Sequence, residues 1–242
     1  MSPPPQGSAN SGRPLLLGHR GHRLPRWGEA ENTLAAFDRA LAAGCDGIEL
    51  DLHATADGAL VIHHDPDLHL RPAPVPIATA SLRALRRLQP HLPTLNQVLR
   101  RYRRTAWFDL EIKAAPVVDH LPALLRRLPP ERGFVVSSFE APVLAALARL
   151  DPSLPLCLNL RRPCSLRKLQ AARSYGVTWI APHQTGCTAW YVRRLRAQGW
   201  YVLVWTVNRP AKMRLLARAG ADALVSDDPY RLVETVSRTQ TG

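Results

Sequence analysis

Histidine, carboxylate and basic side chains stand at or near the ends of apolar runs at several places in this sequence. Carboxylate oxygens are the ligands that hard cations such as Mg²⁺ and Ca²⁺ prefer, and a pair of histidines suits acid/base chemistry near neutral pH. An arginine and a lysine beside the carboxylates would hold an anionic substrate. Together these residue types predict a phosphoryl-transfer site. The residues are His19, Arg20, Glu49, Asp51, His64, Glu111 and Lys113.

The carboxylates Glu49 and Asp51 are two residues apart in an apolar run, so on a strand both side chains point to the same side. Two adjacent like charges repel each other. A structural role would require that one carboxyl group be protonated or that each meet an arginine. We favour a divalent cation held by both residues, with Glu111 of the neighbouring strand as a third ligand.

The histidines His19 and His64 come from two separate predicted strand ends. Each taken singly could instead be a structural core histidine or an imidazole ligand of a transition metal. His63 points away from His64 if that segment is extended, and we interpret it as structural.

The elements that would position these residues alternate along the chain from Pro14 onward, in the pattern of a parallel sheet with crossover helices. Eight strand–helix units predict a (β/α)8 TIM barrel, a single α/β domain over residues 14–242 that follows a disordered tail at 1–13. The predicted strands begin at residues 15, 47, 107, 134, 154, 178, 201 and 223, and an extra run begins at 59. The predicted helices span residues 33–43, 82–88, 95–102, 117–128, 142–150, 166–175, 189–197, 211–219 and 230–236.

In such a barrel the active site lies at the carboxyl ends of the strands, where the candidate residues fall. Trp205, Asn208 and Asp227 end the last two strands and belong to the same edge. The proline-rich stretch at 69–79 predicts a loop over one end of the barrel.

The formal net charge of +13 is carried by 29 arginines and 3 lysines that are spread over most predicted helices. Runs such as 99–104 and 193–196 are typical of solvated helix faces. Neither a nucleic-acid-binding motif nor a basic-aromatic stripe accompanies the charge, so we predict no nucleic-acid partner. A positive field that attracts an anionic small-molecule substrate is the better interpretation.

The four cysteines have no zinc-site spacing and predict reduced thiols. The first residues lack the charged start and apolar stretch of a signal peptide. The sequence contains no run of about 18 apolar residues, so it predicts no membrane span. We therefore expect a cytoplasmic protein without stable membrane association.

Several short motifs follow one another in a characteristic order from Leu15 to Val236, and together they make the sequence resemble the glycerophosphodiester phosphodiesterases. The motifs are GHRG at 18–21, ENT at 31–33, GIELDLHATADGALVIHHDPDL at 47–68, LEIK at 110–113, SSFE at 137–140, VWTVN at 204–208 and DALVSDDP at 222–229.

The resemblance implies a barrel enzyme that uses one divalent cation, Mg²⁺ or Ca²⁺ with Mn²⁺ as an alternative. Its members hydrolyse glycerophosphodiesters to sn-glycerol 3-phosphate and an alcohol. By motif, His19 and His64 would be the acid/base pair, and Arg20 and Lys113 would bind the phosphate. The implied metal ligands are Glu49, Asp51 and Glu111, with Glu31 as a supporting residue near the metal. Trp205 would be a pocket wall, or else an ordinary core aromatic.

Residues 22–30 form a longer segment than the family pattern has, and this segment could bind the alcohol end of the diester or be a solvated basic turn.

The nucleophile could be water or the neighbouring glycerol hydroxyl. Two other functions stay open: a lysophospholipase D-type phosphodiesterase acting on lysophospholipids, and a non-catalytic metal- or phosphate-binding barrel. The presence of both histidines and all three carboxylates disfavours the latter.

Overall fold

The computed structural model describes residues 12–23, 31–71 and 73–238. Residues 1–11 of the predicted tail and 24–30 of the long segment after GHRG lie outside the described residues. Near the start of the described chain, Arg13 forms an ion pair with Asp46. Asp46 also accepts a hydrogen bond from the backbone of Leu16, so these contacts tie the entry of the first strand to the fold.

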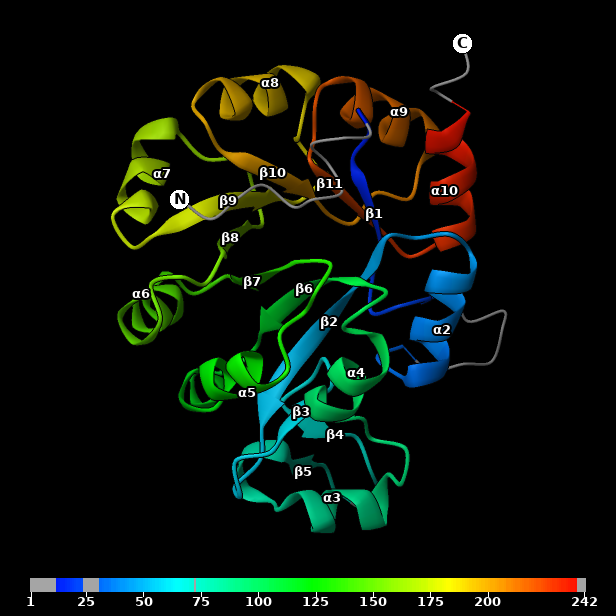
Figure 1. The fold of residues 1–242 in the computed structure, drawn as a ribbon, viewed down its shortest axis with the longest axis vertical. Coiled ribbons are helices and arrows are strands. Elements are labelled where there is room, and N and C mark those ends of the chain that lie inside the picture. The colour runs from blue at the N-terminus through cyan, green and yellow to red at the C-terminus, as the bar shows by residue number, and fades with distance from the viewer. Residues whose placement is uncertain (1–11, 24–30, 72, 239–242) are drawn as a thin grey trace.

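Eight parallel strands form a closed barrel (Figure 1). The first strand pairs in parallel with both the second and the last, which closes the sheet. This arrangement confirms the predicted (β/α)8 fold. The strands are β1 (Leu15–Gly18), β2 (Gly47–Ala54), β6 (Trp107–Ile112), β7 (Phe134–Ser138), β8 (Leu156–Leu160), β9 (Val177–Pro182), β10 (Tyr201–Val204) and β11 (Ala223–Ser226).

Helices surround the barrel on its outside (Figure 1). Several begin where a side chain accepts a hydrogen bond from the first turn, as Thr33, Thr94 and Thr188 do. The helices are α2 (Leu34–Ala42), α4 (Leu95–Tyr102), α5 (Leu121–Arg127), α6 (Ala141–Leu150), α7 (Leu166–Arg173), α8 (Ala189–Ala197), α9 (Pro210–Arg218) and α10 (Pro229–Ser237). None of the helices in the described ranges is both long enough and apolar enough to cross a bilayer.

The prediction of one continuous helix over 117–128 is wrong. A 3₁₀ helix at Ala115–Asp119 is followed by a separate start of α5 at Leu121. Pro122 is the reason, because it lacks an N–H and its ring clashes with the preceding turn. It is tolerated here in the first turn of α5, where no intrahelical partner is needed.

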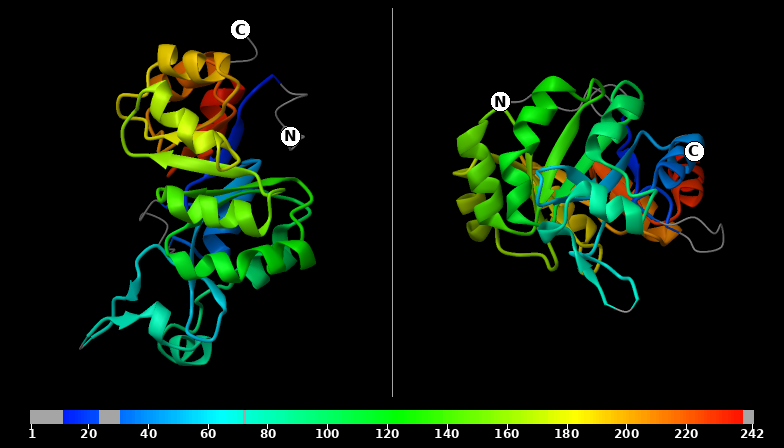
Figure 2. Two further views of the ribbon diagram at one scale, coloured as in Figure 1. Left: turned by 90° about the vertical axis from the view of Figure 1, so that its left-hand side faces the viewer. Right: turned by 90° about the horizontal axis from the view of Figure 1, so that it is seen from below.

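An insertion between β2 and β6 extends away from the barrel (Figure 2). The run predicted from residue 59 forms β3 (Leu60–Ile62), antiparallel to β2. The prediction of a loop at 69–79 holds only in part. β4 (Asp67–Leu68) pairs with β5 (Val75–Pro76), and a 3₁₀ helix spans Ile77–Thr79. A small separate hydrophobic core explains why this stretch forms regular structure. It joins β3, β4, the 3₁₀ helix and α3 (Leu82–Leu88) through Val61, Leu68, Ile77, Leu85 and Leu92.

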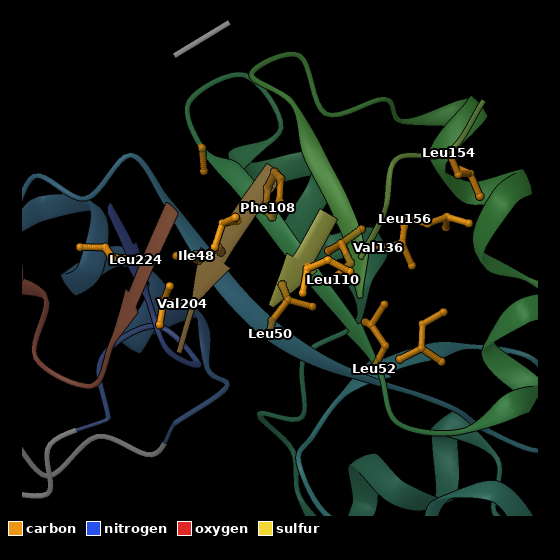
Figure 3. Packing of buried hydrophobic residues seen from close by; sticks show 14 of the residues in the cluster. Ile48, Leu50, Leu52, Phe108, Leu110, Val136, Leu154, Leu156, Val204 and Leu224 are labelled. Atoms are coloured by element: carbon orange, nitrogen blue, oxygen red, sulfur yellow. The ribbon is translucent and has the colours of Figure 1, made fainter. Parts of the chain in front are cut away.

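Side chains alternate along the strands and thereby separate the core from the site. Ile48, Leu50 and Leu52 of β2 pack in the layer between the strands and helices (Figure 3). The intervening residues, Glu49 and Asp51, therefore lie on the inner side of the barrel. Deeper in the barrel, a second cluster that includes Leu17, Trp107, Val135, Cys157 and Trp179 fills the interior. The carboxylates thus stand above a packed apolar floor.

Candidate active site

Three carboxylates meet at the inner side of the barrel. Glu49 and Asp51 of β2 and Glu111 of β6 each offer an oxygen, and these oxygens lie within 4.8 Å of one another. The strand register explains the meeting, because Asp51 pairs directly with Glu111. Glu49 and Asp51 are only 4% and 1% exposed. The predicted proximity of the three residues is therefore present in the fold.

Burial makes the ionised forms of Glu49 and Glu111 unfavourable. It raises the pKa of Glu49 well above its ordinary value, and the nearby charges of Asp51 and Glu111 raise it further. Burial likewise raises the pKa of Glu111, again with Asp51 in support. The three carboxylates offer only oxygen donors, and the nearby basic side chains do not bring the pKa values of Glu49 and Glu111 back to their ordinary level. Such a site fits a hard divalent cation, which would stabilise the ionised carboxylates.

Two basic side chains border the cluster. Nε of Arg20 lies 3.1 Å from Oδ2 of Asp51, and Nζ of Lys113 lies 2.8 Å from Oε1 of Glu111 and 3.4 Å from Oδ1 of Asp51. The structure places Glu31 against the guanidinium of Arg20. Glu31 therefore orients a basic residue of the site and does not belong to the group of three carboxylates.

A tight turn after β1 presents the residues of the GHRG motif. Arg20 and Gly21 both adopt left-handed backbone conformations, with φ of 50° and 80°. A Cβ atom at Gly21 would approach the backbone of Ala36 in α2 to 2.6 Å, so only glycine fits. The turn also directs the Arg20 N–H to Oε2 of Glu49, at 2.8 Å. Strained non-glycine backbone of this kind concentrates at functional sites.

The His19 ring connects the carboxylate cluster to the end of the last strand. Nε2 lies 3.9 Å from Oε2 of Glu49, and Nδ1 lies 2.6 Å from Oδ1 of Asp227. Asn208 donates to the other oxygen of Asp227 and accepts from its backbone N–H. In the neutral ring this contact places the proton on Nδ1, so Nε2 faces the cluster as a proton acceptor.

Asp227 is held in its charged form by these neighbours. Burial alone would raise the pKa of its carboxyl group. The hydrogen bond and charge of His19, the amide of Asn208 and the charge of Arg23 outweigh this effect and hold the pKa below its ordinary value.

His64 lies farther out, as the second residue after the insertion strand β3. Its side chain is 37% exposed, and Nδ1 lies 2.7 Å from Oδ1 of Asp65. Nε2 of His53 lies 3.3 Å from the backbone oxygen of His64, which ties this segment to β2 just beyond Asp51. Within the described residues, no ion pair joins the His64 ring to the three carboxylates.

An aromatic group occupies the opposite part of the barrel mouth. Trp205 is half-buried, and its Nε1 donates to the oxygen of Ala181 at 2.8 Å. Edge-on ring contacts join it to Phe139 at 5.4 Å and to His183 at 4.8 Å between centroids. Trp205 therefore lies at the rim, partly exposed and in contact with Phe139 and His183, and its role as a pocket wall stays a prediction.

Sequence reasoning missed the roles of several site neighbours. Asn32 donates to Oδ2 of Asp51 at 2.8 Å from a left-handed backbone conformation with φ of 59°, and its ENT motif was the available signal. Asp227 and Asn208 were placed at strand ends without a role. Phe139 and His183 carried one signal only, which is their position directly after a strand.

A model of the glycerophosphoryl diester phosphodiesterase family matches residues 19–231. The chain belongs to this family. A glycerophosphodiester phosphodiesterase from Caldanaerobacter subterraneus subsp. tengcongensis is 27% identical over 93% of this chain and 98% of that protein. The predicted family is therefore confirmed.

Two solved structures share the fold of the family member described here. A glycerophosphodiester phosphodiesterase from Thermotoga maritima is 24% identical, with a TM-score of 0.78 over 91% of this chain and 97% of that chain. An Oleispira antarctica phosphodiesterase, solved in complex with the product sn-glycerol-3-phosphate, is 24% identical, with a TM-score of 0.80 over 95% of this chain and 99% of that chain.

The buried position of Asp109 predicts that the stability of the barrel depends on pH. Asp109 lies two residues before Glu111 on β6 and accepts a hydrogen bond from Ser137 at 2.6 Å. Burial raises its pKa to about 7, whereas an unfolded aspartate has a pKa of about 3.9. Between these values the folded state binds a proton that the unfolded state does not, so stability falls as pH rises.

We therefore expect the EDTA-treated protein to lose roughly 1–3 kcal/mol of unfolding free energy between about pH 5 and pH 7.5. Asp109→Asn should remove part of this loss. Urea unfolding at a series of pH values measures both slopes. Equal slopes for the two proteins would contradict the assignment to Asp109.

Proposed function

We propose that the protein hydrolyses glycerophosphodiesters to sn-glycerol 3-phosphate and an alcohol. One observation carries the proposal: three inner carboxylates lie within 4.8 Å of one another at the mouth of a barrel of this family, bordered by His19, Arg20 and Lys113. The sn-glycerol-3-phosphate bound to the Oleispira antarctica relative supports the same product here.

Glu49, Asp51 and Glu111 would hold one divalent cation, Mg²⁺ or Ca²⁺ with Mn²⁺ as an alternative. When bound, such an ion neutralises negative charge that builds up on a phosphate oxygen. Arg20 and Lys113 pair with the carboxylates and would turn their remaining N–H donors to the phosphate oxygens of the substrate. The site thus binds an anionic small molecule.

His19 and His64 would divide the proton transfers between them. One deprotonates the nucleophile, and the other protonates the departing alkoxide. The hydrogen bond to Asp227 fixes the His19 ring with Nε2 toward the carboxylate cluster, and Asp65 gives His64 a matching partner. Both histidines then present Nε2 to the reacting groups while Nδ1 is held by a carboxylate.

The proposal is tested by measuring release of sn-glycerol 3-phosphate from a panel of glycerophosphodiesters. Release that EDTA abolishes, that added Mg²⁺, Ca²⁺ or Mn²⁺ restores and that His19→Ala lacks would support it. No release from any diester with any of these cations would overturn it. Lysophospholipids would then be assayed next, and failure there would favour a non-catalytic phosphate-binding barrel.

We expect Asp227→Asn to lower kcat by about 100-fold, because the His19 ring loses its orientation and its stabilising charge. The exposed Asp119 supplies a matched control, and Asp119→Asn should leave kcat unchanged. In a His19→Ala background the Asp227 substitution should have little further effect. Additive losses in the double variant would show that Asp227 acts independently of His19.

A further inference from the structure

Four consecutive strands are each followed at once by a large rim residue. Phe139 follows β7, Arg161 follows β8, His183 follows β9 and Trp205 follows β10. The carboxylate cluster and His19 belong instead to β1, β2 and β6. The mouth of the barrel is therefore divided into a carboxylate half and an aromatic half, and we call the second half, made of these four residues, the aromatic rim.

Within the aromatic rim, the guanidinium of Arg161 lies over the ring of Phe139, 4.6 Å from the ring centroid. Arg161 is exposed, as is its neighbour Arg162, and no ion pair joins either residue to a carboxylate in the described part of the chain. Glu140, beside Phe139, is exposed and likewise forms no ion pair among these residues. Over the Phe139 ring the aromatic rim thus carries a cation that forms no ion pair among the described residues, and this charge would compete with a ligand cation for that ring.

A buried acceptor without a partner lies just below this rim. Asn159 of β8 is 6% exposed, and its Oδ1 has no hydrogen-bond partner. Leu158 and Leu160 on either side pack against the outer core, so Asn159 lies on the inner side of the barrel. Buried polar atoms in native proteins are normally satisfied. An O–H donor from a bound substrate would satisfy this one.

We propose that the aromatic rim binds the alcohol part of the diester and selects hydroxyl-rich alcohols that are uncharged or anionic, such as glycerol or inositol, over quaternary ammonium alcohols such as choline. The inference rests on the proposed function. The phosphate and the glycerol diol suit the charged, hydrogen-bonding groups of the carboxylate half, which leaves the aromatic rim for the second arm.

Two independent contacts set this preference. A choline ammonium that approaches the Phe139 ring would meet the Arg161 charge there, and like charges repel. Choline also has no O–H once it is esterified, so Oδ1 of Asn159 would stay unsatisfied. A polyol avoids the first cost and donates a hydrogen bond to Asn159.

The test compares kcat/KM for glycerophosphoglycerol, glycerophosphoinositol and glycerophosphocholine. We expect wild-type kcat/KM to be about tenfold higher for the two polyol diesters. Arg161→Gln and Asn159→Leu should each narrow this ratio by about fivefold. Arg149→Gln, at an exposed arginine in the last turn of α6, should leave the ratio unchanged.

The outcomes separate the two proposals. Turnover of none of the three diesters would contradict the proposed function itself. Turnover with equal kcat/KM values, or with preference for choline, would leave that function standing and overturn the inference. If neither substitution narrows the ratio of kcat/KM values between polyol and choline diesters, then Arg161 and Asn159 do not cause the preference, and the inference is likewise overturned.

Discussion

Replacing His19 by alanine is expected to lower kcat by about 10³–10⁴-fold, because positioned proton transfer contributes up to about that much. The ring lies between Glu49 and Asp227, and the alanine variant leaves no group at Nε2 that can accept or give a proton. The measurement is release of sn-glycerol 3-phosphate at saturating substrate and cation. KM should change much less than kcat.

The exposed His91 provides the control for this loss. His91→Ala removes an exposed imidazole that is not part of the carboxylate cluster, and it should keep wild-type kcat. His64→Ala should resemble His19→Ala, and the double variant should be little worse than either single one because the two rings act on one reaction. A His19→Ala enzyme that keeps a tenth of wild-type activity would contradict the acid/base role.

Glu111→Gln is expected to weaken cation binding by about 100-fold and to lower kcat/KM by about 10³-fold at fixed Mg²⁺. The amide keeps the shape of the side chain but removes one of the three negative charges that meet within 4.8 Å. Binding of Mn²⁺, followed by electron paramagnetic resonance, reports the loss without relying on turnover.

Glu234→Gln is the matched control, because Glu234 is exposed on α10 and pairs only with a neighbouring arginine in the described residues. It should leave Mn²⁺ affinity and turnover unchanged. Excess Mg²⁺ should partly restore the Glu111→Gln enzyme, since a weakened site still fills at high concentration. Unaltered Mn²⁺ affinity in that variant would exclude Glu111 as a ligand.

The sequence was most informative where one strand contributes residues both to the hydrophobic core and to the site. In β2, Ile48, Leu50 and Leu52 alternate with Glu49 and Asp51, and this period of two residues predicts the core side and the site side together. The same alternation in β6 predicts that Glu111 faces the inside of the barrel. The register of the two strands, which the fold supplies, then sets Glu111 beside Asp51.

Contacts between distant segments could not be predicted in this way. The pairing of His19 with Asp227 depends on how β1 meets β11, and no periodicity within either strand states it. The ring contacts of the aromatic rim likewise require the order of four strands around the barrel. The β4–β5 hairpin escaped notice because strands of two residues show no alternation.

The closing contact between β1 and β11 also bears on how the protein is made. His19 and Asp227 are 208 positions apart, and β1 gains its second neighbour only after β11 has left the ribosome. A nascent chain that stops earlier contains all three cluster carboxylates but leaves the edge of β1 unpaired and His19 unoriented. Such long-range pairing slows folding. Catalytic competence is thus acquired only once β11 has been synthesised, so chains that stop before β11 are expected to be inactive.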